Sequence, residues 1–197
     1  MREFKCPMTC LAGVAEVWNG QYDFKGLRTS GAAPVILDIG ANCGAFSLWA
    51  SLVHWPLATI HAYEPNPDIF PYLVRNCEPR VQCHNVAVGD TAWTSLHFHP
   101  QHPLCASVHP QKDHTAAKSI RTISPLELPA ADIIKIDTEG AEFEILRMLP
   151  YTPSLLVLEW HGQLQRVNIE NILAGRMRLV ESTVSEDDTG ILKYIRL

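Results

Sequence analysis

The chain has 197 residues and 22.0 kDa, with 16 Lys and Arg against 21 Asp and Glu, a formal net charge of −5. A chain of this length buries about 70% of its unfolded surface, which is enough for one core and too little for two. Its acidic balance argues against nucleic-acid or anionic-membrane binding, which needs a basic face. We therefore expect a single domain over residues 1–197 that binds no nucleic acid.

The sequence predicts neither a targeting signal nor a membrane span. Met1–Cys6 leads into no apolar run of the signal-peptide type, and no uncharged apolar stretch reaches about 18 residues. The six cysteines form no CxxC pair. Their count alone leaves an extracellular disulfide framework open, but dispersed thiols inside apolar runs favour a reducing compartment. We predict a cytoplasmic protein.

Apolar runs typical of buried strands alternate with amphipathic stretches. The expected strands occupy residues 35–39, 58–63, 81–88, 133–136 and 155–158. Helical spacing is found at 45–53, 67–78, 141–148 and near 167–173. Strands that are apolar on both faces and alternate with helices form a parallel sheet covered on each side, so an α/β fold is predicted.

Three segments depart from this alternation. Residues 1–32 hold one amphipathic segment, Cys10–Trp18, and are expected to form a cap whose apolar surface is compatible with a homodimer. Prolines and short alternating runs indicate a hairpin and loop insert at 91–118. Segments 178–183 and 191–195 predict a C-terminal antiparallel hairpin, which makes the sheet mixed.

A glycine loop, Asp38 to Gly44, lies between the first strand and its helix. Glycines let the backbone approach a ligand, and the N-terminus of the helix offers N–H donors. Glu64 ends the second strand, where a carboxylate can accept both hydroxyl hydrogens of a ribose. The alternative is that Gly40 and Gly44 only permit a tight turn and that Glu64 is solvated. Asp38 suits a cationic amino group by charge sign.

The segment Val35–Gly44 resembles the first motif of class I S-adenosylmethionine-dependent methyltransferases, and Ala62–Pro67 resembles their second. Ile134–Glu142 is similar to the hallmark of the FkbM-type family, and Asn85–Asp90 and Leu156–His161 also fit that family. The resemblance covers residues 33–161. It implies a Rossmann-like, mostly parallel sheet of seven strands with helices on both faces.

The resemblance also implies a cofactor, a reaction and a set of residues. The cofactor is S-adenosyl-L-methionine, the product is S-adenosyl-L-homocysteine, and the methyl acceptor is a hydroxyl of a small molecule or carbohydrate. The cofactor-binding positions carried over are Asp38, Gly40, Ala41, Asn42, Gly44, Glu64, Pro65, Val86, Ala87 and Asp137. Two alternatives remain open: a nicotinamide-dependent Rossmann oxidoreductase, which the missing GxGxxG disfavours, and a non-catalytic cofactor-binding module.

The catalytic candidates follow two neighbouring strands. Asp137, Glu139 and Glu142 come after the strand at 133–136, and His161 follows the strand at 155–158. A carboxylate or imidazole at this edge can accept the proton that a hydroxyl acceptor loses. We select Asp137, Glu139 and His161 as catalytic. The alternatives are an N-cap role for the acidic turn, above all for Glu142, and a structural role for His161.

We assign no residue to a metal from the sequence. The insert contains five histidines, at positions 97, 99, 102, 109 and 114. Because their spacing matches no metal-ligand motif, we interpret them as solvent-facing side chains. A divalent ion at the Asp137–Glu142 turn is chemically reasonable, since hard cations prefer oxygen ligands, but the sequence does not require one.

Overall fold

The computed structural model of the chain describes residues 3–24, 26, 31–99, 102–107, 116–185 and 188–197. Its largest element is a seven-stranded sheet in the order β10-β11-β9-β8-β1-β2-β3. These strands are β1 (Val35–Ile39), β2 (Thr59–Tyr63), β3 (Val81–His84), β8 (Ile133–Ile136), β9 (Leu155–His161), β10 (Met177–Ser182) and β11 (Thr189–Arg196). The pairs from β9 to β3 are parallel, whereas β11 pairs antiparallel with both β9 and β10. The predicted mixed sheet is confirmed.

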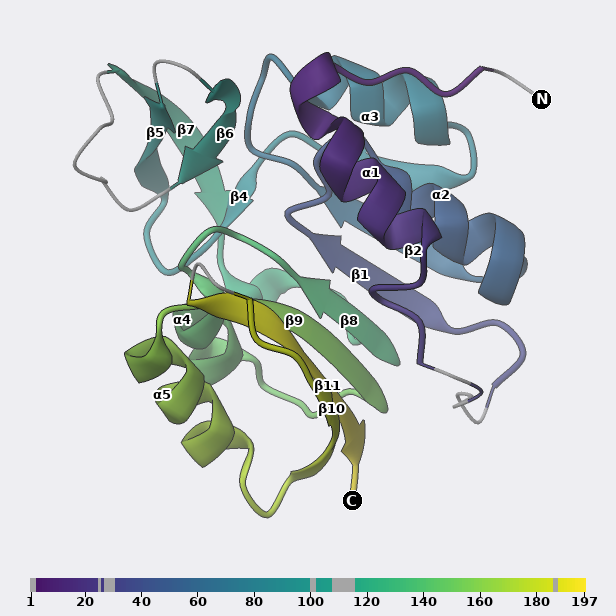
Figure 1. Cartoon of the computed structure of the whole chain (residues 1–197), viewed down its shortest axis with the longest axis vertical. Helices are drawn as coiled ribbons and strands as arrows, with labels where there is room; N and C mark the ends of the chain where they lie inside the picture. The colour runs from purple at the N-terminus through teal and green to yellow at the C-terminus, as the bar shows by residue number, and fades with distance from the viewer. Residues whose placement is uncertain (1–2, 25, 27–30, 100–101, 108–115, 186–187) are drawn as a thin grey trace.

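Helices cover both faces of this sheet (Figure 1). On one face lie α1 (Leu11–Trp18), α2 (Ala45–Trp49), the π-helical turn η2 (Ala50–His54) and α3 (Phe70–Cys77). On the other lie α4 (Glu142–Met148) and α5 (Gln163–Leu173). Each layer has its own core: Phe46 and Trp49 pack in the first, and Ile145 and Trp160 in the second. Burial on both faces explains why the central strands are continuous apolar runs.

The predicted strand at 81–88 is divided into two, which corrects that prediction. β3 ends at His84, and β4 (Ala87–Val88) belongs to a second sheet. The break comes at Asn85, whose Nδ2 donates to the carbonyl oxygens of Glu64 and Pro65 at 2.9 and 3.3 Å. These bonds hold the chain at the end of β2 while its direction changes.

The second sheet has the order β4-β7-β5-β6 and lies beyond the carboxyl ends of the central strands (Figure 1). Its other strands are β5 (Trp93–His99), β6 (His102–Ser107) and β7 (Ala116–Ile123). The insert therefore forms a sheet that begins at Ala87 and ends at Ile123, wider than the predicted 91–118. The side chains of His99, His102, His109 and His114 lie outside the described part, so their predicted exposure stays a prediction.

Two helices begin at other residues than the hydrophobic periodicity predicts. The helix expected at 67–78 begins at Phe70, because Asn66 organises a turn before it. Asn66 Oδ1 accepts a hydrogen bond from the Asp68 backbone at 3.0 Å, a local bond that competes with helix formation. The helix near 167–173 begins earlier, at Gln163. Short 3₁₀ turns occur at η1 (Met8–Cys10) and η3 (Pro125–Glu127).

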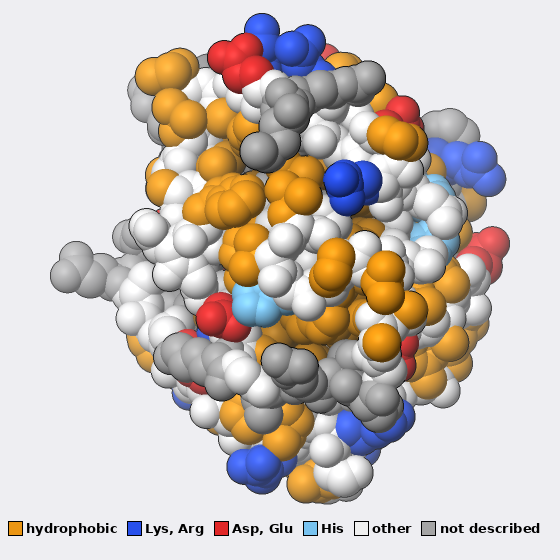
Figure 2. Space-filling model, turned by 90° about the vertical axis from the view of Figure 1, so that its right-hand side faces the viewer, with side chains coloured by type: hydrophobic (Ala, Val, Ile, Leu, Met, Phe, Trp, Pro, Cys, Tyr) orange, Lys and Arg blue, Asp and Glu red, His pale blue; other side chains and the backbone are white. Residues whose placement is uncertain are grey.

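The N-terminal cap carries exposed apolar side chains, as expected. Met8, Leu11 and Trp18 are 81%, 45% and 45% exposed, and Leu52 and Val53 of η2 are also exposed. Figure 2 shows apolar side chains spread over this side of the molecule. Cys6, Cys10, Cys43, Cys77 and Cys83 are free thiols, and Cys10, Cys43 and Cys77 are buried. Within the described residues, no helix has the length and apolar character needed to cross a membrane.

Candidate active site

A cavity opens at the carboxyl ends of β1, β2 and β8, and its empty space is about 740 Å³ when the open solvent at its mouth is included. Here β1 and β8 lie side by side: the chain leaves β1 toward the edge that holds β2, and it leaves β8 toward the opposite edge, which holds β9. Such switch points in open α/β sheets form ligand-binding crevices. The cavity extends from Glu64 and Asn66 to Asp137 and Glu139, and Leu96 of the second sheet also lines it.

The glycine loop owes its shape to close backbone contacts. Gly40 has φ +78°, and a Cβ on it would lie 1.7 Å from the carbonyl oxygen of Asp137. Gly44 has φ +88°, and a Cβ there would lie 2.4 Å from Sγ of Cys77. The alternative that Gly40 and Gly44 permit a tight turn is therefore correct for the backbone of both glycines. Gly40 also lines the cavity, so the turn and the cavity share one backbone.

Glu64 is not a solvated strand end, which overturns that half of the alternative. Its side chain lines the cavity and the residue is only 7% exposed. Its two carboxylate oxygens accept the backbone N–H groups of Asn42 and Asn66 at 2.8 and 2.7 Å. Burial raises the pKa of Glu64 to about 7, although both hydrogen bonds oppose the rise. Each oxygen keeps a lone pair for a ligand hydroxyl.

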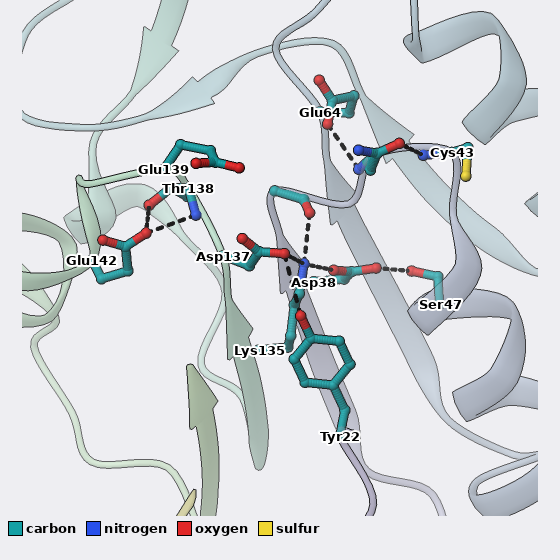
Figure 3. Close-up of polar contacts among 12 residues, drawn as sticks. Tyr22, Asp38, Cys43, Ser47, Glu64, Lys135, Asp137, Thr138, Glu139 and Glu142 are labelled. Atoms are coloured by element: carbon teal, nitrogen blue, oxygen red, sulfur yellow. Dashed lines mark hydrogen bonds and ion pairs between the residues drawn. The ribbon is translucent and has the colours of Figure 1, made fainter. Parts of the chain in front are cut away.

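A chain of polar contacts links the cap, the glycine loop and β8 (Figure 3). Ser47 Oγ donates to Asp38 at 2.6 Å, and Lys135 Nζ lies 3.4 Å from Asp38 and 3.3 Å from Asp137. Lys135 Nζ also donates to the Gly40 carbonyl at 2.6 Å, and Tyr22 donates to Asp137 at 3.3 Å. Burial opposes the charge of Lys135, but Asp137 and Asp38 outweigh it and raise the pKa of Lys135.

Asp38 consequently lies beneath the cavity, not in its wall. The residue has no exposed surface, and its carboxylate is held by Ser47 and Lys135. The predicted contact of Asp38 with a cationic amino group of a ligand remains a prediction. In this structure Lys135 provides the cation beside Asp38. The clear contribution of Asp38 is to position Lys135, which in turn positions Asp137.

Glu139 and Glu142 have opposite roles in the acidic turn. Figure 3 shows Glu142 on the α4 side of the turn and Glu139 on the other side, where Glu139 lines the cavity. Glu142 has no exposed surface, and its Oε1 accepts the N–H groups of Thr138 and Gly140 at 2.9 and 3.1 Å. Burial opposes ionisation of Glu142, but contact with His161 and hydrogen bonds from the backbone of Glu142 and Gly140 lower its pKa to about 2. Glu142 therefore does not cap α4, because the Thr138 and Gly140 N–H groups precede the helix and no side chain caps it; Glu142 instead organises the turn.

The N-cap alternative does not hold for Asp137. Helix α4 begins at Glu142 with Ala141 as its N-cap, and no side chain caps it. Asp137 instead lines the cavity beside Glu139. Burial and the Asp137 charge raise the pKa of Glu139.

His161 is the last residue of β9 and lies beside the acidic turn. Its Nε2 is 3.4 Å from Glu139, and its Nδ1 is 3.4 Å from Glu142. Burial opposes the imidazolium charge, but Glu142, Glu139 and Asp137 raise the pKa of His161 to about 9. Glu159 is two residues earlier on the same face of β9, and burial together with the Asp137 charge raises its pKa to about 8.

The structure brings most of the predicted residues to one cavity. Those that line it are Gly40, Asn42, Glu64, Pro65, Val86, Ala87, Asp137 and Glu139. Asp38, Ala41 and Gly44 lie behind the wall, and His161 touches it through Glu139. Sequence reasoning missed Tyr22, Leu96 and Gln165, which come from other parts of the chain without a local motif. The buried role of Lys135 was signalled only by a charge within an apolar strand.

Comparison with known proteins assigns the fold and the chain's family. The fold is similar to that of solved structures: the Methanococcus jannaschii fibrillarin pre-rRNA processing protein aligns with a TM-score of 0.54 and 15% identity, covering 86% of this chain and 69% of its own. At this identity the likeness shows a shared fold alone.

Three curated relatives share sequence with the chain. Methyltransferase 1 of Beauveria bassiana is 30% identical over 58% of this chain and 57% of its own length. Hexuronic acid methyltransferase AglP of Haloferax volcanii is 26% identical over 82% of this chain and 73% of its own length. The 31-O-demethyl-FK506 methyltransferase FkbM of Streptomyces tacrolimicus is 39% identical over 44% of this chain and 34% of its own length. The chain thus spans between a third and three quarters of these proteins. The methyltransferase FkbM domain matches residues 38–195, which include the glycine loop, Glu64, the acidic turn and His161. The chain therefore belongs to the FkbM-domain family of methyltransferases.

Proposed function

We propose that this protein is an S-adenosylmethionine-dependent O-methyltransferase whose acceptor is a hydroxyl of a sugar or another small molecule. One observation carries the proposal: a single cavity has Glu64 at one end and the Asp137–Glu139 turn, with His161 behind it, at the other. The first end suits a ribose and the second suits a hydroxyl that must lose a proton. Methyl transfer from a sulfonium donor to oxygen needs both.

The residues at the Glu64 end fit the cofactor. The Glu64 carboxylate is held rigid by two backbone N–H groups and faces the cavity, as the recognition of a ribose diol requires. Asn66 is 2% exposed, lines the same wall, and has an Nδ2 without a hydrogen bond to any described group. Val86, Val88 and Leu96 add apolar walls of the kind that a flat base packs against. When bound, S-adenosylmethionine supplies an electrophilic methyl group.

The residues at the other end suit an oxygen acceptor. An acceptor hydroxyl that gains a methyl group gives up its proton, and the Glu139 carboxylate, which lies 3.4 Å from His161, lines the cavity where it can accept that proton. Lys135 fixes Asp137, so the turn that faces the acceptor does not have to reorganise. The names of two relatives, a hexuronic acid methyltransferase and a 31-O-demethyl-FK506 methyltransferase, support a sugar or small-molecule acceptor that is methylated on oxygen.

Two measurements test the proposal. The first is calorimetric titration of the folded protein with S-adenosylhomocysteine, for which micromolar affinity is expected; the absence of binding at millimolar ligand would contradict it. The second measures transfer of an isotopically labelled methyl group to a panel of hexuronic acids, glycosides and macrolide alcohols. If the ligand binds but nothing is methylated, the non-catalytic alternative is favoured. Tight NADH binding in the same calorimeter would favour the oxidoreductase.

A further inference from the structure

We propose that Asp137, Glu139 and His161 together bind one divalent cation of the Mn²⁺ class, whose open positions take oxygen atoms of the methyl acceptor. The role toward the acceptor rests on the proposed function, whereas the metal site itself does not. This goes beyond the sequence, from which no metal ligand was assigned.

The geometry of the three donors suits a metal ion. One ligand atom from each residue lies within 4.8 Å of the ligand atoms of the other two. Bonds of about 2.1 Å separate the donors of an octahedral ion by roughly 3 to 4.2 Å. The remaining difference is within reach of a side-chain rotation, because the Glu139 side chain is 46% exposed while that of His161 is 21% exposed. Of these two ligands, the Glu139 carboxylate is therefore the more exposed and the His161 imidazole the more closely packed.

The orientation of His161 provides an independent argument. Its Nδ1 lies 3.4 Å from the fully buried carboxylate of Glu142, while its Nε2 is directed toward Glu139. A histidine that binds a metal through one nitrogen commonly directs the other at a carboxylate, which fixes the ring and makes the ligand more basic. Glu142 has this position behind His161. An acidic patch on a surface would not supply such a partner.

Gln165 of α5 holds the two halves of the site together. Its Oε1 accepts the backbone N–H of His161 at 2.8 Å. Its Nε2 donates to Glu142 Oε2 and to the Gly140 carbonyl, both at 2.7 Å. The end of β9 and the acidic turn are thus fixed relative to each other before any ion binds. Preorganisation of this kind is what a metal site with ligands from separate segments requires.

The local charges favour a dication. Lys135 lies on the Asp38 side of Asp137, where it pairs with both of these carboxylates. On the other side, Glu139 and Glu142 both face His161. A bound dication would offset these negative charges more fully than an imidazole does.

The donor types indicate the class of ion. Carboxylates suit Mg²⁺, Ca²⁺ and Mn²⁺, whereas imidazole suits first-row transition ions, so a set of two carboxylates and one imidazole fits Mn²⁺ best among the hard ions. Three protein ligands leave open positions on an octahedral ion. A hydroxyl that binds there has a lower pKa, so its proton leaves to solvent more readily and its oxygen is held in place.

The experiment titrates metal-free protein with Mn²⁺ alone and follows the electron paramagnetic resonance signal of free Mn²⁺. We expect one bound equivalent in the wild type. Glu139→Gln and His161→Ala should each weaken binding at least tenfold, and Glu139→Asp should restore most of it. Glu144→Gln, the same substitution at an exposed carboxylate of α4 that pairs with Arg147, should change nothing. Glu142→Gln should weaken binding about 10- to 100-fold through the ring of His161.

Two results would overturn the inference: no Mn²⁺ bound by folded wild type at millimolar metal, or equal binding by wild type, Glu139→Gln and His161→Ala. Circular dichroism reports on folding in each variant. Binding of S-adenosylhomocysteine without Mn²⁺ separates the two proposals, because its absence from folded protein counts against the methyltransferase function while the Mn²⁺ titration still decides the metal site. Methyl transfer that continues undiminished after complete chelation would overturn the acceptor role of the ion.

Discussion

The two ends of the cavity are built in different ways. At the Glu64 end, the contacts are made mainly by backbone groups. Gly40 allows close contact with the Asp137 carbonyl directly after β8, and the N–H groups of Asn42 and Asn66 hold the Glu64 carboxylate. At the acidic end, side chains from β8, the following turn, β9 and α5 converge. Conformation therefore limits substitution at the first end, and charge and orientation limit it at the second. The following predictions test this difference.

The largest expected effect is on folding, at the contact that joins the two ends. Gly40→Ala would place a Cβ 1.7 Å from the Asp137 carbonyl oxygen at a positive φ. We expect a loss of more than about 3 kcal/mol in the free energy of unfolding, measured by chemical denaturation. Gly175→Ala is the control: its φ is +72° but nothing lies within 4 Å, so about 1 kcal/mol is expected. Equal losses would show that only φ matters at Gly40.

Glu139→Gln should have the next largest effect, on methyl transfer and not on cofactor affinity. In the proposed function Glu139 accepts the proton of the acceptor hydroxyl, so loss of its charge beside His161 is expected to reduce methyl transfer by about 100-fold or more. Affinity for S-adenosylhomocysteine should change less than threefold. Glu144→Gln is the matched control and should leave both quantities unchanged. A parallel loss of cofactor affinity would show that the two ends are not separate.

Glu64→Gln tests the opposite end. In the proposed function the Glu64 charge receives the ribose hydroxyls, so its removal should weaken S-adenosylhomocysteine binding roughly 30- to 100-fold, since hydrogen bonds to a charged group contribute about 1.5–3 kcal/mol. Calorimetry measures this directly. Mn²⁺ binding to the same variant should match wild type; a large change in it would contradict the independence of the two ends.

The pH dependence of cofactor binding should follow Glu64. Because burial raises its pKa to about 7, the carboxylate is mostly protonated at pH 6 and mostly ionised at pH 8. Affinity for S-adenosylhomocysteine should rise about tenfold across this range, and the Glu64→Gln variant should show a flat profile. The stability of the unliganded protein should change in the opposite direction, since a raised folded-state pKa favours folding at low pH and this contribution is lost as pH rises through about 7.

Tyr22→Phe should have the smallest effect. It removes the 3.3 Å hydrogen bond to Asp137 and keeps the ring that packs against Phe46. We expect a loss of about 1 kcal/mol or less in unfolding free energy and a few-fold change in methyl transfer. A loss as large as that of Glu139→Gln would mean that the cap participates directly at the acidic end.

The sequence predicted the elements well where one local signal decided them. β1 and β8 have the predicted bounds, because an apolar run buried on both faces leaves little choice of structure. The strand at 81–88 was predicted as one piece, because an apolar pattern carries no information about the hydrogen bonds that the Asn85 side chain donates to the carbonyl oxygens of Glu64 and Pro65. The same limit explains why the second sheet was predicted too narrow.

The sequence by itself determined the glycine loop, the position of Glu64 and the acidic turn, because each is a contiguous motif joined to a strand end. Tertiary structure alone decided which acids face the cavity. Glu142 is buried against Gln165 and His161, whereas Glu139 lines the cavity. Tertiary structure also placed Lys135 between Asp38 and Asp137, and Tyr22 of the cap against Asp137. Local sequence fixes backbone geometry, but the balance of buried charges depends on groups that folding brings together from distant segments.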